Sequence, residues 1–115
     1  MSDSNLSINT THHNNVDVVS ISGRVDSSNY TILDKALKAS LTNGQHHLVL
    51  NMSEVEYLSS AGLRAMVSAL RECKKKSGDV RVAAPSDRVR EVLDLSGLDL
   101  MFTSYPDNEH AMGSF

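Results

Sequence analysis

The sequence lacks the features that mark secreted or membrane proteins. It has one cysteine, Cys73, so no disulfide bond can form within the chain, and the place of Cys73 on a predicted helix indicates a small core residue in a reducing compartment. The first ten residues, MSDSNLSINT, have neither the basic nor the apolar part of a secretory leader. No apolar run approaches the ~18 residues needed to cross a bilayer. These absences predict a cytoplasmic protein with no membrane partner.

The sequence also lacks an excess of positive charge. Its 11 Lys and Arg against 14 Asp and Glu give a formal charge of −3, with both signs interspersed, so there is no basic footprint for nucleic acid. The cations of the run Lys74 to Lys76 are expected in the last turn of a helix, where they oppose the helix dipole. No glycine-rich phosphate loop is present, so we expect no cofactor and no small-molecule substrate. A protein is the expected partner.

Catalytic and metal-binding patterns are weak. The pairs His12-His13 and His46-His47 would point to opposite faces of an extended segment, and no Cys or carboxylate completes a ligand spacing, so we expect exposed turn residues and no metal site. The stretch SSAGL (59–63) is not the G-x-S-x-G elbow of serine hydrolases. A serine hydrolase is therefore only a remote alternative, and we expect no enzyme activity.

The 115 residues fit one domain, 1–115. After a polar leader, LSINT (6–10) and VDVVSISG (16–23) alternate apolar and polar residues, which predicts a hairpin ended by Gly23. HLVLNM (47–52) predicts a buried strand, VRVAA (80–84) another, and LMFTSY (100–105) a possible edge strand. Helical spacing predicts three helices. The first starts at one of Ser27, Ser28 or Asn29 and ends at about 41, the second runs from about 60 to 77 and is ended by Gly78, and the third runs from Pro85-Ser86 to Gly97. Residues 106–115 are expected to form at most a frayed helical tail.

This order of elements predicts an α/β fold with a mixed sheet of four or five strands, mostly parallel, whose first hairpin adds an antiparallel member. The apolar positions of the predicted elements define an expected core. Its residues are Val18, Val19, Ile21, Leu33, Leu37, Val49, Leu50, Leu63, Met66, Val67, Leu70, Val82, Val92 and Leu93.

Two adjacent serines precede the longest predicted helix. Ser59 is the expected N-cap, and Ser60 would occupy the first helical position with its hydroxyl outward, beside the small residues Ala61 and Gly62. A phosphate on Ser60 would carry about −1.5 to −2 charges, which the positive end of a helix tolerates but a partner surface fitted to a neutral hydroxyl does not. The residues alone support both a simple cap and a phosphorylation switch.

Three stretches together resemble one family. GRVDSSNYTILDKAL, HLVLNMSEVEYLSSAGLRAM and VREVLDLSGLDLMF are similar, in spacing and residue type, to the anti-sigma factor antagonists of the STAS domain family, with a matching core of about 6–105. The resemblance implies a single STAS-like domain with helices mainly over one face of the sheet. It implies a module that binds an anti-sigma factor with serine kinase activity when dephosphorylated, is released on phosphorylation, and is restored by a PP2C-type phosphatase.

The resemblance also implies site residues. It places the phosphoacceptor on Ser60. Ser59 stands where many members have an aspartate, so the acidic neighbour of the phosphoacceptor is missing here, and Ser59 is the runner-up as acceptor. Asp26, which alone would be expected to cap the next helix, matches an aspartate of the partner-facing surface. The expected partner-binding residues are Asp26, Ser27, Ser59, Ser60, Ala61, Gly62 and Arg64. The alternative within the family is a non-switching scaffold subunit of a lipid transport or signalling assembly, which would not be phosphorylated.

Overall fold

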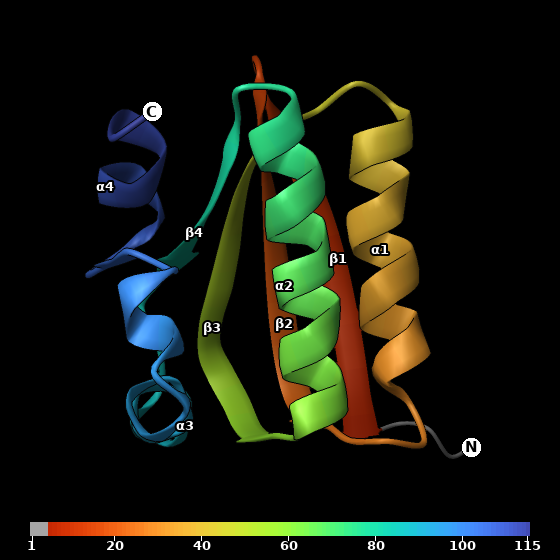
Figure 1. Ribbon diagram of the computed structural model, residues 1–115, viewed down its shortest axis with the longest axis vertical. Helices are drawn as coiled ribbons and strands as arrows, with labels where there is room; N and C mark the ends of the chain where they lie inside the picture. The colour runs from red at the N-terminus through yellow and green to blue at the C-terminus, as the bar shows by residue number, and fades with distance from the viewer. Residues whose placement is uncertain (1–4) are drawn as a thin grey trace.

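The computed structural model describes residues 5–115 (Figure 1), so the polar leader expected over 1–4 lies outside the described residues. These residues include five strands, four α-helices and the short 3₁₀ helix η2. In order they are β1 (Leu6–His13), β2 (Val16–Val25), α1 (Tyr30–Thr42), β3 (His47–Leu58), α2 (Ser60–Lys75), β4 (Asp79–Ala83), α3 (Asp87–Ser96), η2 (Leu98–Leu100), β5 (Ser104–Tyr105) and α4 (Asn108–Gly113).

The five strands form one mixed sheet in the order β1-β2-β3-β4-β5. β1 and β2 are an antiparallel hairpin, and all later neighbours are parallel. α1 and α2 lie side by side across one face of the sheet, and their N-terminal ends lie at the same end of the molecule (Figure 1). The α/β fold predicted from the sequence is confirmed, with five strands. Among residues 5–115, no helix has both the length and the apolar character needed to cross a bilayer.

The main core lies between the sheet and helices α1, α2 and α3. All but three of the predicted core residues are buried. Leu63, Val67 and Val92 are only partly buried, and Ile32 of α1 is 39% exposed. In α2 the buried positions are taken instead by the small residues Ala61, Gly62, Ala65 and Ala69 together with Met66, Leu70 and Cys73.

The C-terminal segment is part of the fold, so the prediction of a frayed tail was wrong. Asp107 caps α4 by accepting a hydrogen bond from the backbone of His110 at 2.8 Å. Ala111 is fully buried in a second, smaller core that includes Val18 and Val49. Six residues are too few to show a helical period, so the sequence pattern could not reveal this packing.

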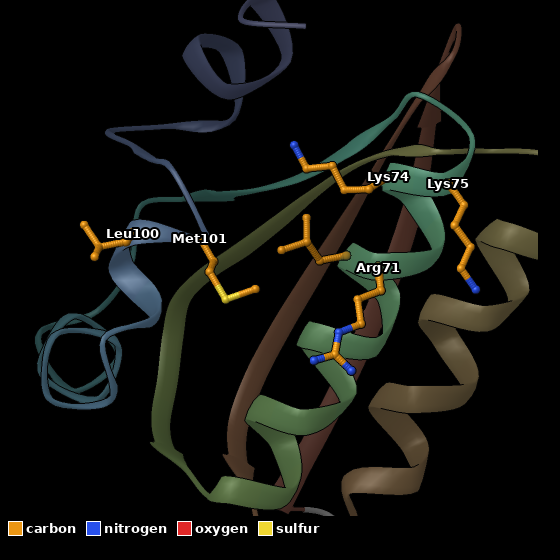
Figure 2. A pocket seen from close by; sticks show the side chains of 6 residues that line it. Arg71, Lys74, Lys75, Leu100 and Met101 are labelled. Atoms are coloured by element: carbon orange, nitrogen blue, oxygen red, sulfur yellow. The ribbon is translucent and has the colours of Figure 1, made fainter.

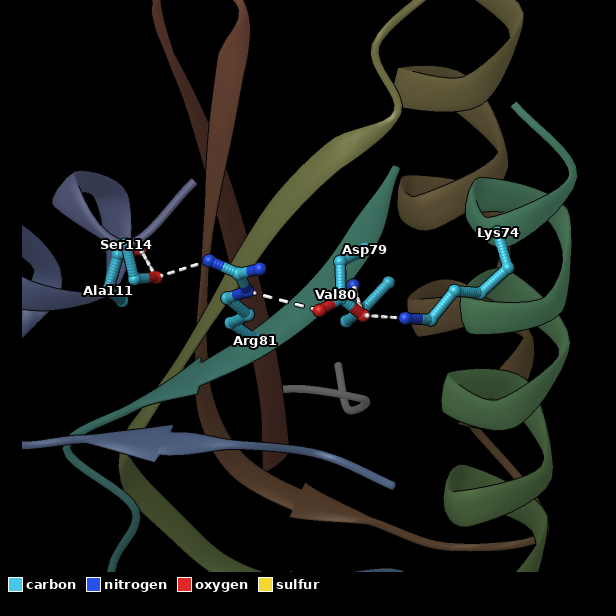
Figure 3. A network of polar contacts seen from close by, with 6 residues as sticks. All are labelled: Lys74, Asp79, Val80, Arg81, Ala111 and Ser114. Carbon is cyan, nitrogen blue, oxygen red and sulfur yellow. Dashed lines mark hydrogen bonds and ion pairs between the residues drawn. The ribbon is translucent and has the colours of Figure 1, made fainter. Parts of the chain in front are cut away.

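Polar contacts also hold α4 to the sheet (Figure 3). Arg81 of β4 bonds through Nη1 to Ser114 Oγ and through Nε to Asp79 Oδ2 at 3.1 Å. Asp79 Oδ1 lies 3.4 Å from Lys74 Nζ at the end of α2. The Arg81 guanidinium stacks on the ring of Phe115 at 4.1 Å from its centroid. These contacts connect α2, β4 and the segment after α4.

Several element ends differ from the predictions. β2 continues past Gly23 to Val25 through a register shift; Gly23 has φ 107°, and an added Cβ would lie 2.0 Å from the carbonyl oxygen of Asn5. β3 extends six residues beyond the predicted strand, to Leu58. The predicted edge strand over 100–105 is reduced to β5, because residues 98–100 form η2 and Phe102, 1% exposed, donates its amide to the carbonyl oxygen of Leu98.

The two glycines expected to end helices act differently. Gly97 follows α3 with φ 77°, as predicted, and Ser86 caps the start of that helix by accepting from the Val89 amide at 3.3 Å. After α2, however, Ser77 takes the left-handed conformation at φ 62°. Gly78 is needed for space, since an added Cβ would lie 1.8 Å from the carbonyl oxygen of His46.

Candidate functional site

Ser59 joins β3 to α2 and is fixed on both sides. Its amide donates to the carbonyl oxygen of Val25, at the end of β2, at 2.9 Å. Its hydroxyl oxygen accepts from the Gly62 amide at 3.3 Å, which confirms the predicted N-cap. The side chain of Ser59 is therefore half-buried and engaged in holding the first turn of α2.

Ser60 is the first residue of α2 and is exposed. Among residues 5–115, its hydroxyl forms no hydrogen bond, and the amides of Ser60 and Ala61 meet no acceptor. These amides and the positive end of the helix dipole surround the hydroxyl with a favourable field for negative charge. Ser60 thus offers a reachable alcohol at a position that can accept an anion.

Ala61 and Gly62 lie in the core beneath Ser60. Ala61 is 5% exposed, and a Cβ added to Gly62 would lie 2.7 Å from Cγ1 of Val25 and 2.8 Å from Cδ1 of Leu58. The start of α2 therefore sits directly on the ends of β2 and β3. In this position the two residues can meet a partner only through their backbone, and their part in partner binding stays a prediction.

Asp26 organises the turn between β2 and α1. Its Oδ1 accepts hydrogen bonds from the hydroxyl of Ser28 at 2.6 Å and from the amide of Ser28 at 2.9 Å. These two bonds hold the pKa of the Asp26 carboxyl below its usual value. The carboxylate caps this turn, while the start of α1 is held through the backbone, with the Tyr30 amide donating to the Asp26 carbonyl oxygen at 2.9 Å.

Asn29 occupies the N-cap position of α1, but its side chain forms no cap bond to the helix. Instead its Oδ1 accepts from the Asp26 amide at 2.8 Å and its Nδ2 donates to the carbonyl oxygen of Arg24 at 2.9 Å. Asn29 is only 8% exposed. It therefore fixes the path of the chain that presents Asp26 and the exposed Ser27, a role that the sequence pattern did not reveal.

The structure brings most of the predicted site residues to one end of the sheet. The bond between Val25 and Ser59 places the Asp26 turn next to the start of α2, and Arg64 lies exposed one turn further along the helix. We call the partly buried Asp26 and the exposed residues Ser27, Ser60 and Arg64 the Ser60 surface.

Exposed aromatic and apolar side chains that sequence reasoning missed lie close in sequence to the residues of the Ser60 surface. Arg24 and Tyr57 are paired in register on β2 and β3, with the guanidinium 4.6 Å from the ring centroid. Tyr30 and Ile32, at the start of α1, are 36% and 39% exposed. A signal was available, because these residues lie within a few positions of the predicted site in the sequence. Exposed aromatic and arginine side chains are typical of protein interfaces.

The surroundings of Ser60 can be compared with those of a serine nucleophile and of a metal site. A serine enzyme needs a base within hydrogen-bond reach of its hydroxyl, and among residues 5–115 no histidine or lysine bonds to Ser60. In the same part of the chain, no group of three or more His, Cys, Asp or Glu side chains is placed to hold a metal ion. The site therefore consists of an exposed alcohol at the start of α2 next to an ordered carboxylate turn.

Comparison with known proteins assigns the family. The STAS domain family matches residues 7–111, and the chain belongs to this family. It is 28% identical to the anti-sigma F factor antagonist of Paenibacillus polymyxa over 106 residues, which cover 91% of this chain and 90% of that protein.

Solved structures agree with this assignment. The crystal structure of an anti-sigma factor antagonist from Mycobacterium paratuberculosis is 31% identical with a TM-score of 0.87, and the match covers 99% of this chain and 96% of that one. SpoIIAA of Bacillus in its phosphorylated form is 17% identical with a TM-score of 0.74 over 94% of this chain and 98% of that one, and it shares the fold. The predicted family is confirmed, and the residues that match it, 7–111, include most of α4.

Proposed function

We propose that this protein is an anti-sigma factor antagonist that works by phosphorylation-controlled partner switching. In its unmodified form it binds an anti-sigma factor with serine kinase activity in the cytoplasm, and phosphorylation of Ser60 releases it. A PP2C-type phosphatase restores the unmodified form, and the chain itself has no catalytic role. The observation that carries the proposal is the exposed Ser60 hydroxyl at the start of α2, beside the ordered Asp26 turn, in a chain similar to anti-sigma factor antagonists.

The contacts favour Ser60 over Ser59 as the phosphoacceptor. The hydroxyl of Ser59 is occupied by the Gly62 amide at 3.3 Å, so its modification would disturb the cap of α2. Ser60 is exposed and can be modified without breaking a contact to residues 5–115. In this reaction the kinase transfers the γ-phosphoryl group of ATP to Ser60 Oγ, releasing ADP and the hydroxyl proton, and the phosphatase hydrolyses the ester to inorganic phosphate.

The charge of the phosphate supplies the switch. At the N-terminal end of α2 the dianion gains roughly 0.3–1 kcal/mol from the helix, so the fold accommodates it. A partner that packs against Asp26 and a neutral Ser60 hydroxyl would have to bury this new charge beside the Asp26 carboxylate. A penalty of about 3–4 kcal/mol weakens binding roughly a hundred- to thousandfold, which is enough to release the partner.

The test uses the anti-sigma serine kinases of the source organism with Mg-ATP. We expect one of them to add a single phosphate, located at Ser60 by peptide mass spectrometry. Ser60→Ala should not be modified, whereas the matched control Ser59→Ala should be. In calorimetry the phosphoprotein should bind that kinase at least a hundredfold more weakly than the unmodified protein.

Two results would overturn this proposal. A phosphate found only at another residue would refute the assignment of Ser60. Equal affinity of the phosphorylated and unmodified proteins for the kinase would refute the charge mechanism, and complete absence of phosphorylation would favour the non-switching scaffold.

A further inference from the structure

A second surface, independent of the Ser60 hydroxyl, runs along the outer side of α2. Two hollows of about 640 and 610 Å³ lie between α2 and the segment that follows α3, and both have Arg71 and Lys75 in their walls. Figure 2 shows Met101 extending from that segment toward α2. We call this continuous depression the α2 groove; its apolar lining is Leu63, Val67, Leu70, Leu98, Leu100 and Met101.

Much of the apolar lining of the α2 groove is open to water, although Leu70 is only 4% exposed. Leu63, Val67 and Leu70 are spaced at i, i+4 and i+7, so they form one stripe along α2, and the first two are only partly buried. On the opposite wall, Leu100 is 91% and Met101 42% exposed. Contiguous exposed apolar side chains of this kind, rimmed by charge, mark sites of protein interaction.

The charge around the α2 groove is opposite to that of the whole chain. Four cations line it, Arg64, Arg71, Lys74 and Lys75, against a single carboxylate, Glu72, in a chain of net charge −3. Lys75 is paired with Glu72 at 3.1 Å and Lys74 with Asp79 at 3.4 Å. Arg64 and Arg71 form no ion pair with residues 5–115. The complementary occupant is therefore acidic.

The length and shape of the α2 groove fit a helix. From Leu63 to Lys75, α2 rises about 18 Å, a little more than three turns. A helix of a partner protein that lies in the α2 groove can place its apolar stripe on Leu63, Val67 and Leu70. Its carboxylates can then face the arginines and lysines on the rim of the groove. We infer that the α2 groove binds an acidic amphipathic helix of a partner protein. It starts one turn after Ser60 and shares Arg64 with the Ser60 surface, so the test below uses the unmodified protein.

A designed peptide tests this inference. The probe is a fluorescent amphipathic peptide of about four turns with leucine at i, i+3, i+4 and i+7 and glutamate at the flanking positions. We expect binding by anisotropy, with ¹⁵N–¹H shift changes confined to residues 63–75 and 98–101. Arg71→Glu and Met101→Ser should each weaken binding at least tenfold, whereas Lys35→Glu, an exposed cation of α1, should leave it unchanged. Circular dichroism verifies that each variant is folded.

Other results would overturn the inference. A peptide of equal charge with serine in place of leucine should bind at least tenfold more weakly; equal affinity would show a purely electrostatic patch. Vesicles containing anionic lipid that bind and displace the peptide would identify a membrane surface instead. Self-association of the protein that Arg71→Glu abolishes would identify a second copy as the occupant. Because the probe is independent of Ser60, failure here leaves the phosphorylation switch untouched.

Discussion

Replacement of Gly62 by alanine tests how tightly α2 is seated on the sheet. The new Cβ would lie 2.7 Å from Val25 Cγ1 and 2.8 Å from Leu58 Cδ1, closer than side-chain carbons normally approach. The end of the Leu58 side chain can rotate away. Val25 cannot, because it is β-branched, fully buried and held in β2. The helix must therefore shift by a few tenths of an ångström or the core must rearrange.

Two opposing effects set the size of the change. Alanine is favoured over glycine in a helix interior by up to about 1 kcal/mol, whereas overpacking a core costs typically 1–3 kcal/mol. We expect a net loss of about 1–2 kcal/mol in the free energy of unfolding, which lowers the Tm of a domain of this size by roughly 5–10 °C.

Gly113→Ala is the matched control. Gly113 is the last residue of α4, and an added Cβ would meet no atom within 4 Å. The same substitution there should be stabilising by about 0.4–1 kcal/mol. Both variants are compared by urea and thermal unfolding. If Gly62→Ala were as stable as Gly113→Ala, the close contact of α2 with Val25 and Leu58 would be refuted.

Three further predictions concern side chains already described. Ser59→Ala should lower the free energy of unfolding in urea by about 0.5–2 kcal/mol through loss of the cap, while Ser60→Ala should change it by less than about 0.5 kcal/mol; equal effects would contradict the assigned roles. Burial raises the pKa of the Cys73 thiol to about 11. Cys73 should therefore react far more slowly with a thiol reagent at pH 8 in the folded protein than in denaturant. The contribution of this thiol to the stability of the fold should be lost as pH rises from about 9 toward 11. The pKa of Asp26, measured by NMR, should lie below the usual 3.8 and should rise in Ser28→Ala. The contribution of Asp26 to stability is then present above the usual pKa and is lost as pH falls through the folded-state pKa. An unchanged pKa in the variant would show that Ser28 is not the cause.

The sequence predicted those features that depend on local signals. Alternation and short apolar runs located the strands, and helical spacing located the three longer helices. Ser59 was recognised as a cap because it is a serine before an apolar helical repeat, and Pro85-Ser86 was placed at the start of a helix. Gly97 was correctly placed after a helix, since a left-handed residue there favours glycine.

Features that depend on contacts between distant segments could not be predicted. Gly78 resembles a helix terminator in sequence, yet what requires glycine is the carbonyl oxygen of His46, 32 residues earlier in the chain. Asn29 resembles a cap, yet its amide group holds the end of β2. Leu63 and Val67 have helical spacing, but the alanines of α2 take the core positions beside them.

In the candidate site, too, local features could be predicted from the sequence, whereas contacts between distant segments could not. The position of Ser60 at the start of a helix followed from its neighbours in the sequence. Its proximity to the Asp26 turn depends on the hydrogen bond between Ser59 and Val25, and the exposure of Tyr30 and Tyr57 depends on the assembled fold. The α2 groove was not predicted, because one of its walls is formed by residues that the sequence had placed in a strand.

The order of the strands has a consequence for the way the protein is made. Each strand pairs with the one that immediately precedes it in the chain, so none has to insert between two partners already joined. A polypeptide emerging from the ribosome can therefore extend the sheet by successive addition at one edge, with only modest loops to close at each step. The last segment to appear, α4, then covers the valines left open on the far face.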